Sequence, residues 1–273
     1  SFAHRMSLGR DCQAQVVRLG LHHHCGWPTK EGPVVKPDPE MPRSLHLRLA
    51  SYNIQKCIGL DLRRLPRRIL GVIDSLGAQI VVLQEADKRL PPRPAALPHF
   101  VLDEAGWNIA DLGGAGSLGW HGNAIIWKGA DLAVRALGHH SLPGFEPRGA
   151  VRVEFETKFG PLRVVGMHLG LLAASRRHQI VHLSSEMSKL SPMPTVWAGD
   201  FNEWSRQPVL DHLAPDVRFL PPIASFPAPR PLGPLDRIAV GGGLGVGGHG
   251  VHQLRPAHIA SDHLPVWADL RLN

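Results

Sequence analysis

Carboxylate, amide and imidazole side chains recur in this sequence where apolar segments end, and two short segments stand out among them. Gly199-Asp200-Phe201-Asn202 follows an apolar run, and Ser261-Asp262-His263 precedes another. Carboxylates bind hard cations or activate water, and imidazole exchanges protons near neutral pH. The two segments therefore indicate a hydrolytic site that uses a metal ion.

Three oxygen-bearing side chains are the candidate metal ligands. Glu85 and Asp262 supply carboxylates, and Asn53 supplies a neutral oxygen. Mg²⁺ takes one or two carboxylates and completes its coordination shell with water and substrate phosphate. Such an ion polarises a phosphoryl oxygen and neutralises the charge that builds up in the transition state. We therefore expect a hard divalent cation as cofactor.

The remaining polar residues of this kind are candidates for acid–base and hydrogen-bonding work on a phosphoester. Asp200 can orient or deprotonate the attacking water, and the Asn202 amide can donate to a phosphate oxygen. His168 and His263 can donate to the pentacovalent centre, or one of them can act as the base. Asp236 is the candidate partner of His263, because a buried carboxylate fixes the tautomer of an imidazole and raises its pKa.

Arg148, Asn123 and Trp204 are candidate substrate contacts. Arg148 precedes a predicted strand and can reach a phosphate, although a solvated loop charge is nearly as common. Asn123 flanks a Gly-rich segment. Trp204 can stack on a base or a lipid headgroup, whereas most tryptophans pack into a core.

The spacing of apolar residues predicts the elements that position these side chains. Alternation over 45–54 predicts a strand that ends near Asn53. Apolar residues recur at helical spacing over 62–76, with Asp61 as N-cap and Gly77 as the stop. Further strands are expected at 79–83, 123–127, 132–137, 150–156, 162–168, 195–198, 235–240 and 265–270, and a second helix at 171–190.

Strands outnumber helices in this order, and hairpins are mixed with crossovers. We therefore expect an α/β fold in which two packed mixed β-sheets are flanked by helices, rather than a doubly wound sheet. Strand ends converge at one edge of a sheet, so the polar residues that follow them should meet there. The glycines at 241–250 predict a flexible loop between strands.

The composition is that of a globular protein with a basic balance. With 273 residues, of which 43% are hydrophobic and 19% charged, the chain can form one large α/β domain. The net charge of +7 favours an anionic partner such as nucleic acid or another phosphorylated molecule. Three cysteines without a CxxC pair argue against a disulfide framework, and no apolar run reaches the length of a membrane span. We expect a cytoplasmic monomer.

Two regions of the chain differ in composition. Residues 1–44 carry three adjacent histidines and several prolines without a sustained period, which predicts an extended or disordered N-terminal tail. Regular apolar spacing begins at Leu45, so that residues 45–273 are expected to form a single catalytic domain.

The polar motifs resemble, in their order, the signature of the endonuclease/exonuclease/phosphatase superfamily. The matching segments are Ser51-Tyr52-Asn53-Ile54, Leu83-Gln84-Glu85, His168-Leu169, Gly199-Asp200-Phe201-Asn202, Leu235-Asp236-Arg237-Ile238 and Ser261-Asp262-His263. The resemblance implies a four-layer α/β sandwich that hydrolyses a phosphoester with Mg²⁺ or Mn²⁺. It also implies that Asn53 and Glu85 lie near the metal, that Asp200 and Asn202 act at the nucleophile and the phosphate, and that Asp236 pairs with His263.

Two residues depart from the abasic-site repair branch of that superfamily. The branch carries an acidic residue or Asn where this chain has Gln55, and it favours Tyr where this chain has His168. The leading expectation is a DNA endonuclease-like phosphodiesterase, and the alternative is a phosphoesterase of phospholipids or inositol phosphates. A third possibility is a catalytically silent module that binds a phosphate ligand, but the intact set of carboxylates and histidines argues against it.

Overall fold

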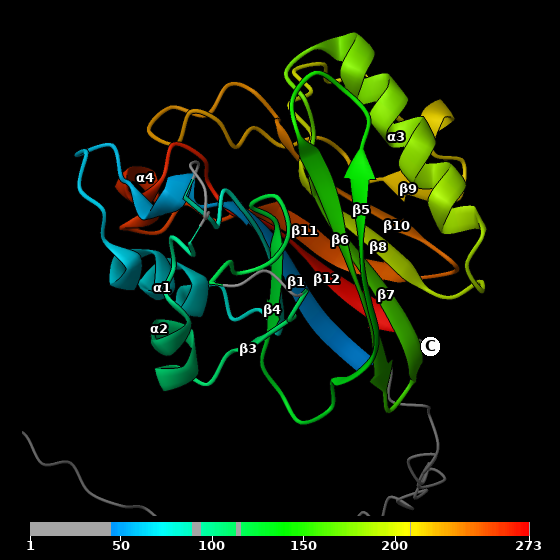
Figure 1. Ribbon diagram of the computed structural model, residues 1–273, viewed down its shortest axis with the longest axis horizontal. Helices are drawn as coiled ribbons and strands as arrows, with labels where there is room; N and C mark the ends of the chain where they lie inside the picture. Colours follow the sequence, from blue (N-terminus) through cyan, green and yellow to red (C-terminus); the bar gives the residue numbers. More distant parts are fainter. Residues whose placement is uncertain (1–44, 89–93, 113–115, 208, 273) are drawn as a thin grey trace, which may run out of the picture. The chain divides into compact units, whose positions relative to one another are not determined.

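Two six-stranded β-sheets face each other in the computed structural model, which describes residues 45–88, 94–112, 116–207 and 209–272 (Figure 1). The first sheet has the strand order β11 (Gly245–Val251), β12 (Val266–Leu272), β1 (Leu45–Asn53), β2 (Ile80–Gln84), β4 (Ala124–Trp127) and β3 (Asn108–Ile109). The second sheet has the order β5 (Ala133–Leu142), β6 (Arg148–Thr157), β7 (Gly160–His168), β8 (Thr195–Asp200), β10 (Asp236–Gly241) and β9 (Val217–Phe219). Each sheet is mixed, because β1 and β2 run parallel, as do β7 and β8, while their other neighbours are antiparallel.

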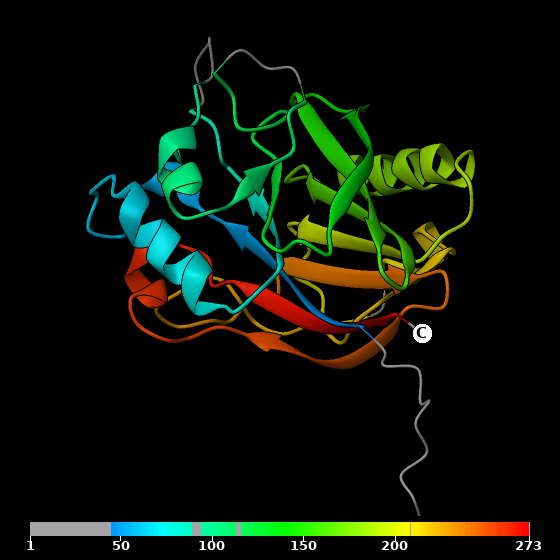
Figure 2. The same ribbon diagram turned by 90° about the horizontal axis from the view of Figure 1, so that it is seen from below.

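Helices cover the outer faces of both sheets. Figures 1 and 2 place α1 (Pro66–Ser75), α2 (His99–Glu104) and α4 (Ala257–Ala260) beside the first sheet, and α3 (Ala173–Ser188) beside the second. Two 3₁₀ turns complete the regular elements of the described chain, η1 (Gln55–Cys57) and η2 (Asp211–Leu213). Among these helices, none is long and apolar enough to cross a membrane.

Three separate apolar cores lie between the four layers. The central core packs one sheet on the other and includes Leu49 of β1 and Val196 of β8. A second core joins Tyr52 of β1 to Ile73 of α1, and a third joins Trp197 of β8 to Leu183 of α3. Successive residues of a strand point to opposite faces, so one strand serves two cores and must be apolar on both sides.

This architecture confirms the predicted α/β sandwich of two packed mixed sheets flanked by helices. The predicted tail over residues 1–44 lies outside the residues that the structure describes. All described residues belong to one compact unit of the chain.

The first helix begins four residues later than the spacing predicts. Helix α1 starts at Pro66, since proline at the first helical position has no amide that needs a partner. Asp61 is therefore not its N-cap; it accepts a hydrogen bond from the Arg63 amide and forms an ion pair with Arg68. Gly77 does follow the helix, with a φ of +61° that suits glycine.

The glycines at 241–250 do not form a flexible loop throughout. Most of them belong to β11, an edge strand that pairs with β12 and has an irregularity between Val246 and Gly248. Gly250 lies directly under the Trp267 ring, where an added Cβ would come within 2.8 Å of the ring. Glycine is used here for close packing of an aromatic ring on the strand, which apolar periodicity does not register.

Gly199 is a position where the sheet tolerates no side chain. A Cβ on Gly199 would lie 2.0 Å from the backbone oxygen of Met167 on the neighbouring strand β7. We expect Gly199→Ala to lower the free energy of unfolding in urea by about 2–3 kcal/mol, because the strands would have to separate. Gly71→Ala is the control, because Gly71 is an exposed residue of α1 and an added Cβ meets nothing within 4 Å; this change should stabilise the protein by about 0.5–1 kcal/mol. A Gly199→Ala protein as stable as wild type would contradict this packing.

Candidate active site

The ends of five strands bring the predicted polar residues to one edge of the sandwich. Asn53 ends β1 beside the end of β2, and Glu85 follows β2 directly. In the second sheet the register sets His168 of β7 and Asp236 of β10 on either side of Asp200, the last residue of β8. The fold therefore fixes these side chains through backbone pairing, which holds them more rigidly than free loops would.

Asp200 is the centre of this arrangement and bridges the two sheets. Its Oδ2 accepts a hydrogen bond of 3.0 Å from Asn53 Nδ2 of the first sheet. The same oxygen lies 3.4 Å from His168 Nε2 and 3.8 Å from His263 Nε2. Its Oδ1 accepts a hydrogen bond of 2.9 Å from the backbone N–H of Asn202, a residue held at a φ of +51°. The buried carboxylate thus has partners on both of its oxygens.

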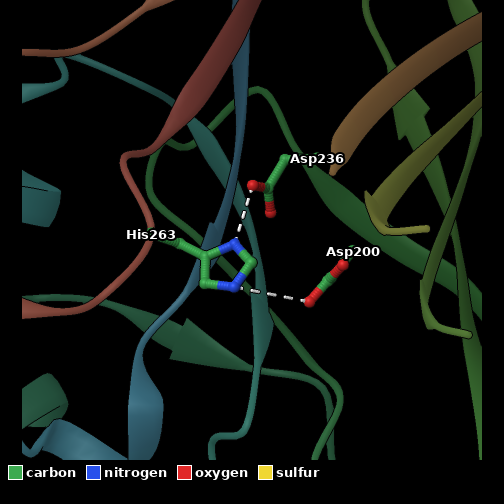
Figure 3. Close-up of side chains that lie close together, drawn as sticks. All are labelled: Asp200, Asp236 and His263. Carbon is green, nitrogen blue, oxygen red and sulfur yellow. Dashed lines mark hydrogen bonds and ion pairs between the residues drawn. The ribbon is translucent and has the colours of Figure 1, made fainter. Parts of the chain in front are cut away.

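His263 is oriented by Asp236 on the opposite side of its ring (Figure 3). His263 Nδ1 donates to Asp236 Oδ2 over 2.9 Å, so that Nε2 is the nitrogen turned toward Asp200. Asp236 Oδ2 also accepts a bond of 2.5 Å from the hydroxyl of Ser225. Within the described chain, Asp236 Oδ1 is buried without a hydrogen-bond partner.

The surroundings of the two histidines shift their pKa values in opposite directions. Burial lowers the pKa of His263, but the carboxylates of Asp236, Asp200 and Asp262 outweigh it and raise that pKa to about 10. Burial also lowers the pKa of His168, where Asp200 opposes the shift and Arg148 reinforces it, so the net pKa is below the usual value. At neutral pH, His263 is an imidazolium and His168 a neutral imidazole.

The two buried aspartates also differ. Burial raises the pKa of Asp236, and the raised value persists despite the charge and hydrogen bond of His263. Burial acts in the same sense on Asp200, but His168, His263 and the bonds from Asn202 and Asn53 hold its pKa below the usual range. Asp200 is therefore an anion that faces a cationic donor, a pairing that suits acid–base chemistry at one centre.

The candidate metal ligands, Glu85, Asp262 and Asn53, are hard oxygen donors, and the two carboxylates are close enough for Glu85 to affect the pKa of Asp262. Burial raises the pKa of Asp262, and the negative charge of Glu85 raises it further. No lysine or arginine of the described chain forms an ion pair with Asp262. Asn53 Oδ1 accepts one bond, from the Gln55 amide, and keeps a second lone pair. Two neighbouring carboxylates and an amide oxygen fit a hard divalent cation.

Asp200, Asp236 and His263 form a second group whose ligand atoms lie within 4.8 Å of one another. In this group, however, His263 Nδ1 and Asp236 Oδ2 are already bonded to each other. At neutral pH the His263 ring is an imidazolium, which has no free lone pair for a metal ion and repels a cation. The chemistry of the donors therefore favours the Glu85 side of the site.

The candidate substrate contacts lie around this centre in different states. Arg148 pairs with Glu146 at 2.7 Å and stands close enough to act on the pKa of His168. Asn123 uses its Nδ2 to bond the Gly149 oxygen at 2.9 Å, which leaves a buried Oδ1 that can only accept. Trp204 is 58% exposed and meets the ring of Phe226 edge to face.

Three residues that the sequence reasoning does not single out touch the site. Lys56 forms an ion pair with Glu85, Ser225 binds Asp236, and the Phe226 ring lies 4.9 Å from that of His263. Ser225 and Phe226 belong to a Pro-rich connection with no apolar period. Lys56 lies three residues after Asn53, and that nearness to the first motif is the one signal that the sequence offers.

Comparison with known proteins gives one family and a consistent fold. A model of the Endonuclease/Exonuclease/phosphatase family matches residues 50–263. The fold is similar to that of a family protein from Bacteroides thetaiotaomicron, at 18% identity and a TM-score of 0.68 over 85% of this chain and 99% of that one. No curated protein sequence matches the chain significantly.

Two further solved structures are similar to the same extent. A mannosyl-6-phosphatase from Bacteroides thetaiotaomicron is 18% identical, with a TM-score of 0.66 over 82% of this chain and 99% of that one. The human Nocturnin catalytic domain with bound sulfate is 20% identical, with a TM-score of 0.63 over 84% of this chain and 95% of that one. At such identities the similarity establishes the fold alone.

The pairing of His263 with Asp236 makes a titration that NMR can follow in metal-free protein. Because the pKa of His263 is higher in the folded chain than its unfolded value of about 6.5, the pair stabilises the fold fully below that value. The stabilisation disappears as the pH rises through the folded pKa of about 10. We expect the His263 ring to remain an imidazolium at pH 8 in wild type and to be neutral there in Asp236→Asn. A neutral wild-type ring at pH 8 would contradict the assignment.

Proposed function

The chain belongs to the endonuclease/exonuclease/phosphatase family, and we propose that it is a metal-dependent phosphoesterase that cleaves a P–O bond by attack of water. The observation that carries the proposal is the contact geometry of Asp200. An anionic carboxylate lies within 3.8 Å of a cationic imidazole, and the two groups have pKa values shifted in opposite directions. Such a pair can take a proton from water and supply hydrogen bonds to the developing charge.

Each residue has a role that its contacts support. Asp200, with its lowered pKa, orients the water and accepts its proton. His263 donates from Nε2 to a phosphoryl oxygen, while Asp236 and Ser225 hold its ring in place. His168 is neutral and can donate or accept a second bond at the same centre.

Asn202 and the candidate metal ligands complete the site. The side-chain amide of Asn202 donates one N–H of Nδ2 to the Leu169 backbone oxygen at 2.9 Å, and its second N–H can donate to a phosphate oxygen. Glu85, Asp262 and Asn53 would hold Mg²⁺ or Mn²⁺, which neutralises charge on the phosphoryl group. Arg148 can bind a phosphate if its guanidinium exchanges the ion pair with Glu146 for one with the substrate.

Nucleic acid is the leading substrate class. The basic balance of the chain favours a polyanion, and Trp204 presents an exposed ring next to Phe226 that a nucleobase can stack on. A phosphorylated polyol or sugar, such as an inositol phosphate, is the second candidate substrate, because one of the proteins of similar fold is a mannosyl-6-phosphatase from Bacteroides thetaiotaomicron. The cytoplasmic location and the monomeric state stay predictions of the sequence.

The metal requirement and the substrate class can be tested in one experiment. The purified 273-residue chain is offered single- and double-stranded DNA, RNA, inositol phosphates and phospholipids with Mg²⁺ or Mn²⁺. We expect chelator to abolish hydrolysis and added Mn²⁺ to restore it, since the cation neutralises the charge on the phosphoryl group. Hydrolysis that survives chelation would sink the metal-dependent mechanism, and a preference for inositol phosphates would replace the nucleic-acid assignment.

Removing either member of the charged pair should cost most of the turnover. We expect Asp200→Asn and His263→Ala each to lower kcat by at least about 10²-fold, because each loses proton transfer or a donor at the reacting centre. Asp103→Asn and His178→Ala, on the exposed faces of α2 and α3, are the matched controls and should turn over like wild type. Near-wild-type kcat for the Asp200 or His263 variant would remove that residue from the mechanism.

A further inference from the structure

The turn that follows β1 has an unusual backbone. Gln55, Lys56 and Cys57 have φ values of +43°, +56° and +60°, a left-handed conformation that residues other than glycine seldom adopt even singly. Left-handed backbone is costly at such residues and persists only where its surroundings enforce it. The turn is therefore held in place for a reason that local sequence preference does not give.

Several contacts enforce this turn. The Gln55 amide donates to Asn53 Oδ1, and the Cys57 amide donates to the Ile54 oxygen at 2.7 Å. Cys57 is fully buried in the core beside α1, and the Arg64 guanidinium donates to the Lys56 oxygen at 2.8 Å. The consequence is that the Lys56 side chain leaves the backbone in one fixed direction.

That direction leads to Glu85. The Lys56 ammonium forms an ion pair with the Glu85 carboxylate, and the Lys56 amide also donates to the Glu85 backbone oxygen at 3.1 Å. Glu85 is itself left-handed, with a φ of +51°. Two strained residues are thus bonded through both backbone and side chain, with about a quarter of each side chain exposed.

We propose that Lys56 is a resident counter-cation that occupies the cation position on Glu85 until a divalent ion displaces it. The inference rests on the proposed function, because Glu85 is a metal ligand only there. Without a cation, the charges of Glu85, Asp200 and Asp262 would face each other in a partly buried site, which is costly. The ammonium offsets this repulsion and keeps Glu85 oriented, and the ion must then compete with it for the carboxylate.

Competition predicts a measurable effect on metal affinity. When only a fraction of the protein has its ligand free, the apparent affinity falls by that fraction. Removing the ammonium should therefore tighten metal binding, by on the order of tenfold if Lys56 occupies Glu85 for about nine tenths of the time. If the ion pair were purely structural, removing the Lys56 ammonium would instead lower the stability of the protein and leave its metal affinity unchanged or weaker.

The test is a titration of the 273-residue chain with Mn²⁺ in the absence of substrate, with free Mn²⁺ read by electron paramagnetic resonance. Lys56→Gln should bind Mn²⁺ about tenfold more tightly than wild type. Lys56→Arg keeps the charge and should bind like wild type. Arg64→Gln is the matched control, because it removes one charge and one bond to the same turn without touching Glu85, and it should also bind like wild type.

A second measurement on wild type does not depend on any variant folding. Lysine acylation is followed by mass spectrometry with and without Mn²⁺. Lys56 should react several times faster when Mn²⁺ is bound, because its ammonium has left Glu85, while Lys158, paired with Asp131 on the surface, should not change. Equal Lys56 reactivity with and without Mn²⁺ would overturn the inference.

The outcomes separate this inference from the proposed function. If Lys56→Gln binds Mn²⁺ no more tightly than wild type while hydrolysis stays chelator-sensitive, the role of Lys56 is wrong and the function stands. Tighter binding in Arg64→Gln as well would show a general field effect and overturn the specific role. If neither wild type nor Lys56→Gln binds Mn²⁺, both the inference and the metal-dependent mechanism fail.

Discussion

The buried carboxylate of Asp200 places a demand on its surroundings that both sheets meet. A carboxylate removed from water loses several kcal/mol of solvation unless hydrogen bonds and opposite charge replace it. Here one hydrogen bond comes from the Asn53 side chain of the first sheet and another from the Asn202 backbone N–H. The imidazoles of His168 and His263 lie within 4 Å of the same carboxylate. The same contacts that compensate the charge tie the two sheets together at one edge, so the stability of that edge and the chemistry of the site rest on one group.

The two imidazoles around Asp200 are not equivalent, and the difference comes from what lies behind each. Asp236 accepts a hydrogen bond from His263 and is itself bonded to Ser225, so at neutral pH the His263 ring is charged and its Nε2 is a donor. At His168, burial lowers the pKa and the positive charge of Arg148 lowers it further, which keeps that ring neutral. An anion, a charged donor and a neutral imidazole therefore meet within 4 Å without any of them having to change protonation before a substrate binds.

The sequence predicted those parts of the molecule that follow from strand periodicity. Asn53, His168 and Asp200 end apolar runs, and parallel or antiparallel pairing must then bring them to a common edge. Strand β11 was not predicted because its glycines leave room for side chains of the neighbouring strand β12, such as Trp267 over Gly250, and glycine has no apolar side chain to show a strand period. Lys56, Ser225 and Phe226 escaped because they lie on irregular backbone, whose course depends on left-handed residues and long-range bonds that periodicity does not encode.

In the proposed mechanism the cation sits on the Glu85 side of Asp200 and leaves the Asp236–His263 pair intact. Crystals grown with Mn²⁺ and phosphate, with data collected at the manganese absorption edge, locate the ion by its anomalous signal. We predict a peak on the Glu85 carboxylate, with a phosphate oxygen facing His263 Nε2 and the bond from His263 Nδ1 to Asp236 preserved. A peak between Asp200, Asp236 and His263 would contradict this position.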